Sequence, residues 1–372
     1  MTVARKPALS FTVPVDEIMP AIDACASGTA PRSNISMLQA ILIEAIPEGV
    51  ILTASDGQGW VKRAVNAFVV EPGRTLINAK LLKDAVGLLS GELDFTIREG
   101  VPTLKSGKST SKLMSLAFDE DFPEAPAYEG SWSLEVSAAE LKSLHGQVKR
   151  AVTSDISRPA LQGVQFWVRN GKLTLAATDT HRLKVARLDV EAEGLNIIVR
   201  PQDIEAILDL GYSDSEIVSL RGDSHRISAE RMGSSIVAQL MQGTYPNWER
   251  VIPAERSGEW LVDKKDLAQA IKGVMPWASL NANRVRFQND GEGIKVMARS
   301  EERGEAEIEC DAEIAKPHDI HFAVNGRYAL DMIDACPTDQ IRIGFTQRTR
   351  PVQFFPADDS GWEGVIMTMA LA

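Results

Sequence analysis

Cysteine is scarce in this chain of 372 residues, and the three that occur, Cys25, Cys310 and Cys336, form no Cys-x-x-Cys pair. An odd number of cysteines without such a pair argues against a disulfide framework and favours a reducing compartment. The sequence has no apolar run of transmembrane length and no basic segment followed by an apolar one at its N-terminus. We therefore expect a soluble, cytoplasmic protein that does not associate with a membrane.

Signatures of catalysis are also missing. No nucleophile elbow, dinucleotide fingerprint or zinc-ligand spacing occurs. The segment KSGKST, from Lys105 to Thr110, is similar to a phosphate-binding loop. However, six residues separate Gly100 from Gly107 where that loop has four. The segment is more typical of a hairpin that leads into a strand.

Two histidine-containing segments have residue types that occur in reactive or metal sites. His318 and His321 are three residues apart on an expected strand, which places them on opposite faces and argues against a shared metal. Asp179 and His181 have the composition of an acid–base pair, but Asp followed by a polar residue at a strand end more often forms a turn. We therefore expect no catalytic residue, no metal and no cofactor.

Acidic residues outnumber basic ones by 51 to 40, which gives a formal net charge of −11. This charge argues at first against a nucleic-acid partner. The placement of the basic residues weakens that objection. In the helix expected over residues 140–152, one stripe is apolar, and away from it lie Lys142, Lys149 and Arg150.

Basic residues recur on other expected helices, where they lie away from the apolar face or near a helix start: Lys80, Lys83, Arg200, Lys265, Lys272 and Arg327. On any single helix they are most simply explained as a solvated face. Their recurrence on equivalent helices favours a shared basic surface. The first expected helix does not fit, because it carries Asp16, Glu17 and Asp23.

One sequence pattern occurs three times at nearly even intervals. The chain has LTASDGQGWV from Leu52, LAATDTHRLK from Leu175 and VMARSEERGE from Val296, so the intervals from Leu52 to Leu175 and from Leu175 to Val296 are 123 and 121 residues. A period of this length is too long for a solenoid repeat and suits three copies of a whole domain.

Linkers are expected where the composition changes. Residues 119–131 are rich in proline, acidic and small residues, and residues 244–258 correspond to them in position. We place domain boundaries accordingly at 1–128, 129–253 and 254–372. Short alternating runs and the turn at Asn170-Gly171 indicate antiparallel strands. Each domain is therefore expected to be of the α+β class, with two helices packed on one face of an antiparallel sheet.

Four further segments make a family resemblance specific: SRPALQGV from Ser157, ATDTHRL from Ala177, YPNWERVIP from Tyr245 and the chain end VIMTMALA. With the three tandem domains, they resemble the bacterial DNA polymerase III beta subunit family, the replicative sliding clamps. The resemblance covers the whole chain and is weakest in the first domain. There PRSNISMLQAI, from Pro31, only loosely follows the family's Arg-x-Thr-Leu-Pro-Ile-Leu pattern.

The resemblance implies a ring made by two subunits joined head to tail, with helices lining the hole around double-stranded DNA. A ring that slides needs diffuse positive charge and no base contacts, so a net negative charge is compatible with this role. The residues expected to face DNA are Arg32, Lys80, Lys83, Lys142, Lys149, Arg150, Arg158, Arg200, Lys265, Lys272, Arg284 and Arg327. Arg32 and Arg158 fall at loops that are equivalent in the family, and the others rest mainly on charge and helix face.

The resemblance also implies a cleft for a short peptide that carries Gln and apolar residues. The clamp loader and the replicative and repair polymerases bind to family members through such peptides. By motif, its walls are Leu161, Thr178, Thr180, His181, Arg182, Leu183, Pro246, Arg250, Val251, Pro351, Val365, Ile366, Met367, Thr368, Met369 and Ala370. The chain departs from the family pattern at Thr180, where Gly is usual, at Thr368, where Pro is common, and at Ala370, where Arg is common.

Charge patterns suggest how two copies join. Lys105, Lys108 and Lys112 lie in a segment without acids, whereas Glu301, Glu302 and Glu305 begin a strongly acidic one. Head-to-tail assembly brings such segments together. By family position an apolar centre is expected from Leu113 on one subunit and Pro276, Trp277 and Leu280 on the other.

Two other interpretations remain open at this point. A non-catalytic three-domain protein that binds another ligand has the same triplication without forming a ring. An enzyme that acts on nucleotides or sugars requires an unrecognised site between the domains.

Overall fold

The computed structural model describes residues 8–116, 122–125, 130–289, 291, 293–316, 320–358 and 360–370. The chain divides into two compact units. The first consists of Met1–Ala138 and Gln202–Leu240, and the second of Ala139–Pro201 and Met241–Ala372. The division passes through the middle repeat, because half of that repeat packs with each of its neighbours in sequence.

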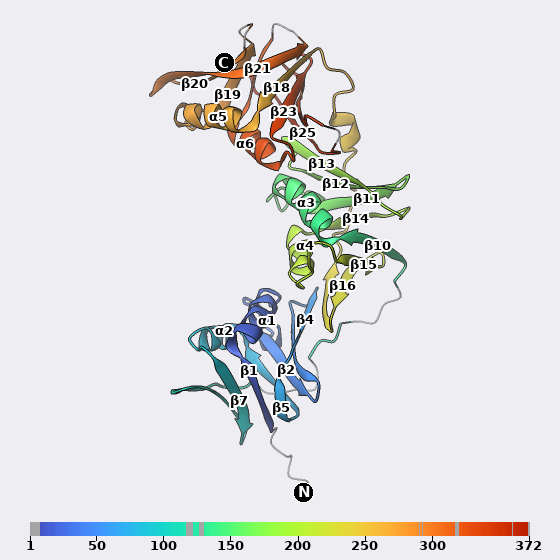
Figure 1. Ribbon diagram of the computed structural model, residues 1–372, viewed down its shortest axis with the longest axis vertical. Coiled ribbons are helices and arrows are strands. Elements are labelled where there is room, and N and C mark those ends of the chain that lie inside the picture. Colours follow the sequence, from blue (N-terminus) through green and yellow to red (C-terminus); the bar gives the residue numbers. More distant parts are fainter. Residues whose placement is uncertain are drawn as a thin grey trace. The chain divides into compact units, whose positions relative to one another are not determined.

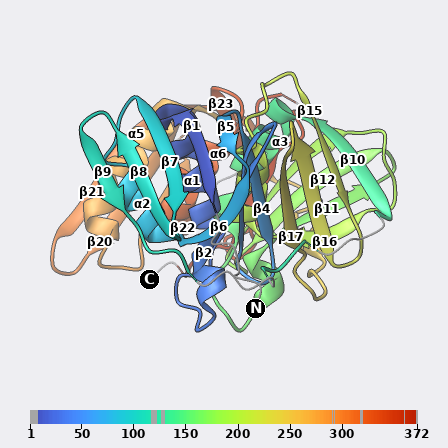
Figure 2. The same ribbon diagram turned by 90° about the horizontal axis from the view of Figure 1, so that it is seen from below.

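The first unit contains two antiparallel sheets. The five-stranded sheet consists, in spatial order, of β5 (Phe68–Glu71), β1 (Leu9–Pro14), β7 (Glu92–Arg98), β8 (Val101–Ser106) and β9 (Ser109–Lys112). The eight-stranded sheet consists of β10 (Trp132–Ser137), β15 (Ile217–Gly222), β16 (Arg226–Arg231), β17 (Ser234–Gln239), β4 (Trp60–Val65), β3 (Gly49–Ser55), β2 (Ala40–Ile46) and β6 (Gly73–Asn78). Figure 2 shows β9, β8, β7 and β1 side by side.

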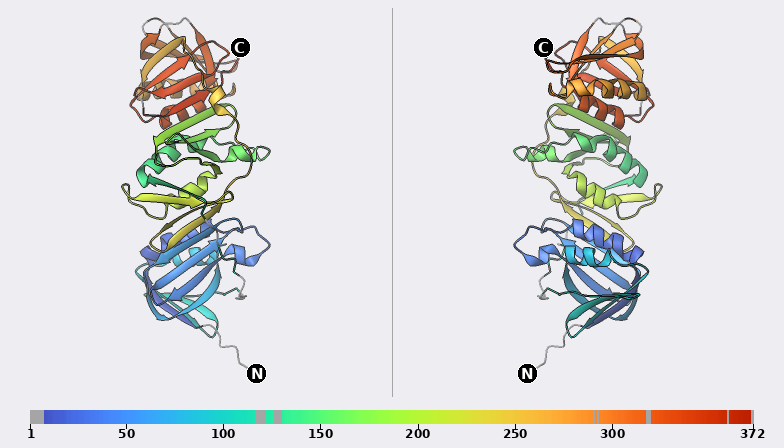
Figure 3. Two further views of the ribbon diagram at one scale, coloured as in Figure 1. Left: turned by 90° about the vertical axis from the view of Figure 1, so that its right-hand side faces the viewer. Right: turned by 90° about the vertical axis from the view of Figure 1, so that its left-hand side faces the viewer.

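Helices α1 (Val15–Ser27) and α2 (Ala79–Val86) lie against each other, and α1 packs on β3 and β4 (Figure 3). The unit also contains η1 (Ser36–Gln39), a 3-10 helix, and α4 (Pro201–Leu208) apart from its first residue. The middle and first repeats share one sheet here, because Ile236 of β17 pairs with Val61 of β4.

The second unit contains one twelve-stranded sheet. Its strands, in spatial order, are β14 (Asn196–Val199), β11 (Val164–Arg169), β12 (Lys172–Thr178), β13 (Arg182–Asp189), β25 (Glu363–Ile366), β24 (Val352–Pro356), β23 (Gln340–Phe345), β18 (Gly258–Asp263), β21 (Gly304–Lys316), β20 (Gly293–Ser300), β19 (Arg284–Asn289) and β22 (His321–Asn325). The sheet crosses from the middle to the last repeat where Leu183 of β13 pairs with Val365 of β25.

The helical segments of this unit are α3 (Ala138–Val148), apart from its first residue, α5 (Lys264–Ala278), α6 (Gly326–Ala335) and the 3-10 helices η2 (Lys149–Ala151), η3 (Pro159–Gln162) and η4 (Trp248–Val251). In Figure 1, α5 and α6 lie next to each other on the same side of β18 and β23. Asp263 caps α5 by accepting from the backbone N–H of Lys265 at 2.8 Å, and Asn325 caps α6 in the same way through Arg327 at 3.0 Å.

The same order of elements occurs three times. A strand followed directly by a helix opens each repeat, as β1 and α1, β10 and α3, and β18 and α5. A second strand and helix follow later, as β6 and α2, β14 and α4, and β22 and α6, and three strands close each repeat. The predicted α+β fold with three tandem copies is confirmed.

Alternation of apolar and polar residues explains why the strands form. In β7, Leu93, Phe95 and Ile97 are buried while Glu92, Asp94 and Arg98 are not. The turn at Asn170-Gly171 connects β11 and β12 with φ values of 55° and 66°, as expected of a tight hairpin. The segment that contains Lys105 and Lys108 forms the predicted hairpin of β8 and β9.

Two details differ from the sequence-based expectation. The helix expected over residues 140–152 ends at Val148, and η2 continues from Lys149 to Ala151 as a tighter 3-10 turn. The segment 244–258 is not a loose linker, because Tyr245 and Trp248 are buried in an apolar cluster with Leu161, Leu183 and Val365. Of the corresponding segment 119–131, part lies outside the described residues.

Candidate functional site

A cleft of about 810 Å³ opens in the second unit beside β13 and β25. Residues predicted from the sequence make up much of its lining: Thr178, Thr180, His181, Arg182, Leu183, Pro246, Arg250, Val251, Pro351, Val365 and Met367. The cleft therefore brings together four separate segments of the chain. Its volume lies within the range of sites that bind small molecules or peptide side chains.

The remaining predicted cleft residues lie elsewhere. Leu161 is buried in the apolar cluster that also contains Leu183 and Val365. Ile366 is fully buried, and Met369 donates its backbone N–H to the carbonyl oxygen of Ala323 at 2.7 Å. Thr368 and Ala370 are likewise absent from the cleft lining.

Sequence reasoning missed another group of lining residues, which are Asn247, Trp248, Ile252, Pro253, Ala254, Glu255, Thr346, Thr349 and Arg350. Most of them belong to the segment interpreted as a linker. The two aromatic residues of this segment, Tyr245 and Trp248, indicate burial, because large aromatic side chains are usually buried in a folded protein and an exposed linker rarely contains them. Trp248 donates its indole N–H to Gln165 Oε1 at 2.7 Å, and Tyr245 donates its hydroxyl to the carbonyl oxygen of Ala176 at 3.2 Å.

The turn between β12 and β13 forms one wall of the cleft. Asp179 Oδ1 accepts hydrogen bonds from the backbone N–H groups of His181 at 3.0 Å and Arg182 at 2.9 Å. Thr178 Oγ1 accepts from the backbone N–H of Thr180 at 3.1 Å. These bonds confirm that Asp179 serves the turn, as its sequence context indicated. Thr180 has a φ of 76°, a left-handed conformation that is strained for a β-branched residue.

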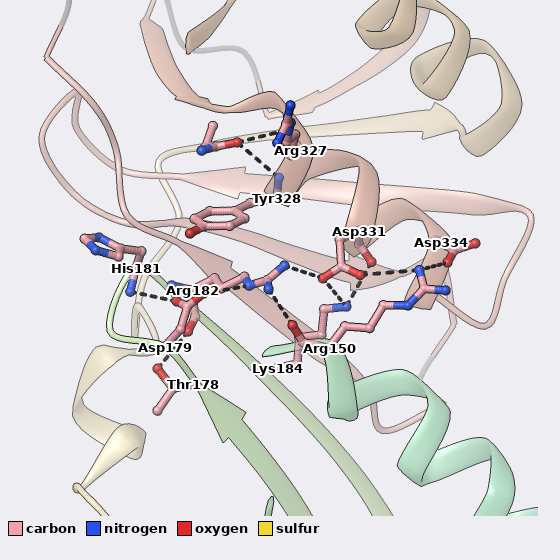
Figure 4. A network of polar contacts seen from close by, with 11 residues as sticks. Arg150, Thr178, Asp179, His181, Arg182, Lys184, Arg327, Tyr328, Asp331 and Asp334 are labelled. Carbon is pink, nitrogen blue, oxygen red and sulfur yellow. Dashed lines mark hydrogen bonds and ion pairs between the residues drawn. The ribbon is translucent and has the colours of Figure 1, made fainter. Parts of the chain in front are cut away.

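Arg182 joins this wall to the elements behind it. Its Nε donates to Asp179 Oδ2 at 3.0 Å, its Nη1 donates to Asp331 Oδ2 at 2.6 Å, and its Nη2 donates to the carbonyl oxygen of Arg150. The guanidinium also stacks over the ring of Tyr328, 4.4 Å from the ring centre. Figure 4 shows these partners converging on Arg182. These contacts connect Arg182 to the turn, to η2 and to α6.

Lys184 lies two residues further along β13, and its side chain is 1% exposed. Its Nζ donates to the carbonyl oxygen of Asp331 at 3.0 Å and lies 2.7 Å from Asp331 Oδ2. Burial lowers the pKa of Lys184 to about 8, although the Asp331 carboxylate opposes that shift.

Basic residues predicted to face DNA gather around two neighbouring depressions in the second unit. One, of about 780 Å³, has Arg150, Lys265, Lys272 and Arg327 in its lining, together with Lys264, which was not predicted. The other, of about 470 Å³, has Lys142, Lys149 and Arg150 in its lining. Arg150, Asp331 and Asp334 belong to both. Residues from α3, η2, α5 and α6 thus form one surface, which we call the basic surface.

The other DNA-facing candidates lie outside the lining of those depressions. Lys80 and Lys83 are exposed on α2, where Lys83 pairs with Asp23 at 2.9 Å. Arg32 is exposed in the loop before η1, Arg200 precedes α4, and Arg284 begins β19. Arg158 donates to Thr180 Oγ1 at 3.2 Å, so it lies beside the cleft-lining turn.

The residues predicted to join two copies lie in one segment of the first unit and in two segments of the second. Lys105 and Lys112 lie on β8 and β9, with Lys108 in the turn between them. Leu113, however, is only 7% exposed, whereas Met114 is 82% exposed. This follows from local geometry, because the Leu113 backbone N–H donates to the carbonyl oxygen of Pro102 at 2.8 Å and successive side chains point to opposite sides.

In the other unit, the end of α5 contacts the turn between β20 and β21. Trp277 Nε1 donates to the carbonyl oxygen of Arg303 at 2.8 Å, and Arg303 Nη1 donates to that of Pro276 at 2.7 Å. Leu280 is 51% exposed nearby in sequence. Glu301 and Glu302 follow β20, and Glu305 lies on β21. Acidic and apolar residues alternate along β21 from Glu305 to Glu309.

Within the described ranges, no group of three His, Cys, Asp or Glu side chains could hold a metal ion. His321 begins β22, and His318 lies outside the described residues. The same ranges contain no helix that is both long enough and apolar enough to cross a membrane. The three cysteines are buried and free.

Family models match nearly the whole chain. Residues 9–126, 135–247 and 249–370 match, in order, the N-terminal, central and C-terminal domains of the DNA polymerase III beta subunit. The chain belongs to the DNA polymerase III beta subunit family. The resemblance inferred from the sequence is thereby confirmed, and with it the interpretation as a sliding clamp, a processivity subunit without catalytic activity of its own.

Individual relatives agree with this chain in length and fold. A curated beta sliding clamp from Staphylococcus epidermidis is 24% identical, over 96% of this chain and 98% of that protein. The structure of the Thermotoga maritima beta subunit matches with a TM-score of 0.90 and 24% identity, over 98% of this chain and all of that one. A Pseudomonas aeruginosa sliding clamp, bound to griselimycin, matches with a TM-score of 0.91, 24% identity and the same coverage.

Proposed function

We propose that two copies of this chain form a head-to-tail ring that encircles duplex DNA without sequence specificity. The ring tethers the replicative polymerase and other partners for processive synthesis. One observation carries the proposal. Within the second unit, a largely apolar cleft and a surface rich in lysine and arginine have no lining residue in common. A clamp needs both, because it must hold a protein and a DNA duplex at once.

The basic surface has the properties of a sliding contact. Its cations come from several helices and stand on long, flexible side chains, which suits diffuse attraction to phosphates. Each good base contact is worth about 1–3 kcal/mol and would stop a clamp at particular sequences. We propose Lys142, Lys149, Arg150, Lys265, Lys272 and Arg327 as the DNA-facing group of this unit. Arg32, Lys80, Lys83, Arg158, Arg200 and Arg284 remain further candidates.

The cleft is proposed to bind the Gln-containing peptide of polymerases and of the clamp loader. Leu183, Val251, Val365 and Met367 offer apolar walls, and Met adapts readily to different side chains. Arg250, Arg350 and Glu255 add charged groups at the same cleft. Among the residues predicted from the sequence, the eleven that line the cleft are the proposed site.

Ring closure is proposed to join β9 of one copy to β21 of the other. Among the described strands, β9 pairs only with β8, and the first half of β21 pairs only with β20. Each therefore has one edge with unpaired backbone groups. Lysines line the β8–β9 hairpin, and glutamates line the start of β21, so the two edges are complementary in charge. Met114, Trp277 and Leu280 are the proposed apolar centre.

Three further points belong to the same proposal. The domain boundaries are those expected from the sequence, at 1–128, 129–253 and 254–372. The protein acts in the cytoplasm, where the replication machinery works. The clamp loader opens the ring and closes it around DNA.

Particle images of the purified protein, combined with analytical ultracentrifugation, test this assembly. We expect closed rings in the images and a sedimenting species with the mass of two chains. Open rods or arcs, with the mass of one chain at every concentration at which the images are taken, would show that the chain does not form the proposed ring.

A further inference from the structure

Asp331 of α6 lies at the meeting point of three basic side chains. Its Oδ2 accepts from Arg182 Nη1 at 2.6 Å and lies 2.7 Å from Lys184 Nζ, and its Oδ1 is 3.8 Å from Arg150 Nη1. Arg150 also pairs with Asp334 Oδ2 at 2.6 Å. Figure 4 shows this set of side chains bridging β13, η2 and α6.

The members of this network differ sharply in exposure. The Lys184 side chain is 1% exposed and that of Asp331 11%, whereas those of Arg150 and Asp334 are 61% and 66% exposed. Arg150 also belongs to both depressions of the basic surface. A phosphate that approaches this surface can therefore reach Arg150, while Lys184 stays fixed to α6.

At its other end the network contacts the peptide cleft. Arg182 lines the cleft and uses its guanidinium nitrogens on Asp179, Asp331 and the Arg150 carbonyl oxygen. A second DNA-facing candidate, Arg158, donates to Thr180 of the same cleft-lining turn. The wall of the cleft is thus tied directly to residues on the DNA side.

We infer that Asp331 couples the two sites, so that phosphate bound at Arg150 raises the affinity of the cleft for its peptide. This inference rests on the proposed function. In the free protein the Arg150 guanidinium forms ion pairs with both Asp331 and Asp334. Its positive charge also repels those of Arg182 and Lys184. A phosphate that pairs with Arg150 neutralises this repulsion. The Asp331 carboxylate then pairs with Arg182 and Lys184 alone. Arg182 is then held more firmly against the cleft, and a preordered wall binds a peptide at lower cost.

The test measures both ligands on the full-length protein. A fluorescent peptide with Gln and a downstream Leu-Phe pair is titrated at low salt, with and without a saturating short DNA duplex. We expect the duplex to tighten peptide binding by about fivefold, at the lower end of allosteric effects. Because coupling is reciprocal, saturating peptide should tighten duplex binding by the same factor.

Matched variants assign the effect to Asp331. In Asp331→Asn, which removes the shared charge, the duplex should leave peptide affinity unchanged. Arg150→Gln, at an exposed position, should give the same loss of coupling even if Asp331→Asn fails to fold. Lys272→Gln removes a cation of the same depression that, among the described residues, forms no ion pair with Asp331, and it should keep the coupling. Asp334→Asn should keep it too, because Asp334 contacts Arg150 and not Arg182.

Three outcomes would overturn the inference. If peptide and duplex each bind the wild-type protein but neither changes the affinity of the other, the coupling is wrong and the proposed function stands. If the duplex weakens peptide binding, DNA competes for the cleft instead. If the wild-type protein binds neither ligand, the proposed function itself fails.

Discussion

The backbone N–H of Met367 donates to the carbonyl oxygen of His181 at 2.9 Å. This bond joins the residue after β25 to the turn between β12 and β13, and both residues line the cleft. The last strand of the chain and the turn of the middle repeat thus form one continuous wall. Met367 is 41% exposed, so it is available to a ligand.

Met367→Asp should weaken binding of a Gln- and Leu-Phe-containing peptide by at least about tenfold, because an apolar contact worth about 1.5–3 kcal/mol is replaced by a charge. Calorimetry measures the change. Thr368→Asp is the matched control, since this neighbour does not line the cleft, and it should bind nearly as wild type does. Equal losses in both variants would mean that the tail acts through stability and not through contact.

Thr180→Gly should stabilise the protein. Left-handed backbone costs a residue other than glycine about 1–2 kcal/mol, and Thr180 has a φ of 76°. Relief of that strain outweighs the exposed hydrogen bond from Arg158, so we expect a net gain of about 1 kcal/mol in the free energy of urea unfolding. Thr180→Ala removes the hydroxyl but keeps the strain and should give no such gain. A gain of equal size in the alanine variant would assign the effect to the hydroxyl.

Lys184 should make stability depend on pH. Burial lowers its pKa from 10.5 to about 8 in the folded protein, so between these values the unfolded chain binds the proton more tightly. The contribution of Lys184 to the free energy of unfolding therefore rises as pH rises through that window, by up to about 3 kcal/mol.

The measurement compares the wild type with Lys184→Met across that pH range. Burial also raises the pKa of the Cys25 thiol and of Tyr245, which lowers stability as the pH rises above their ordinary pKa values. Both groups are present in either protein, so their contributions cancel in the difference. We expect the stability of the wild type relative to the variant to increase with pH. A difference that stays constant would show that Lys184 keeps an ordinary pKa.

Exchange of charge at the proposed ring junction should abolish and then restore the dimer. One variant changes Lys105, Lys108 and Lys112 to Glu, and the other changes Glu301, Glu302 and Glu305 to Lys. Each alone places like charges at both junctions and should sediment as a monomer. Mixed in equal amounts they should form a heterodimer, because both junctions are then complementary again. Dimers of either variant alone would place the junction elsewhere.

Much of the fold followed from the sequence because it depends on local patterns. The strand and helix at the start of each repeat, the Asn170-Gly171 turn and the β8–β9 hairpin are all set by short-range alternation and turn residues. The pairing of β13 with β25, and of β17 with β4, could not be predicted in this way. Strand partners between repeats are chosen by the edges that remain after each repeat has folded.

The lining residues of the cleft could be predicted where the family motif is strong. They were missed in the segment 244–258, because its composition is typical of a linker. The motifs predict Thr178, Arg182 and Val365, whereas the proline and charged residues around Trp248 predict a linker there. At the proposed junction the sequence could not show which of Leu113 and Met114 points outward, because a shift of one residue reverses the face. The Asp331 network could not be predicted from the sequence either, because it joins residues that are far apart in the chain.

Retention on DNA of different topology tests the central claim most directly. The protein is loaded onto a nicked circular plasmid by its clamp loader and ATP, freed of unbound protein, and divided into two samples, one of which is cut by a restriction enzyme. A ring that is linked to DNA topologically should stay on the circle and leave the cut DNA from its ends. Equal retention on circular and linear DNA, or no retention on either, would contradict the sliding clamp.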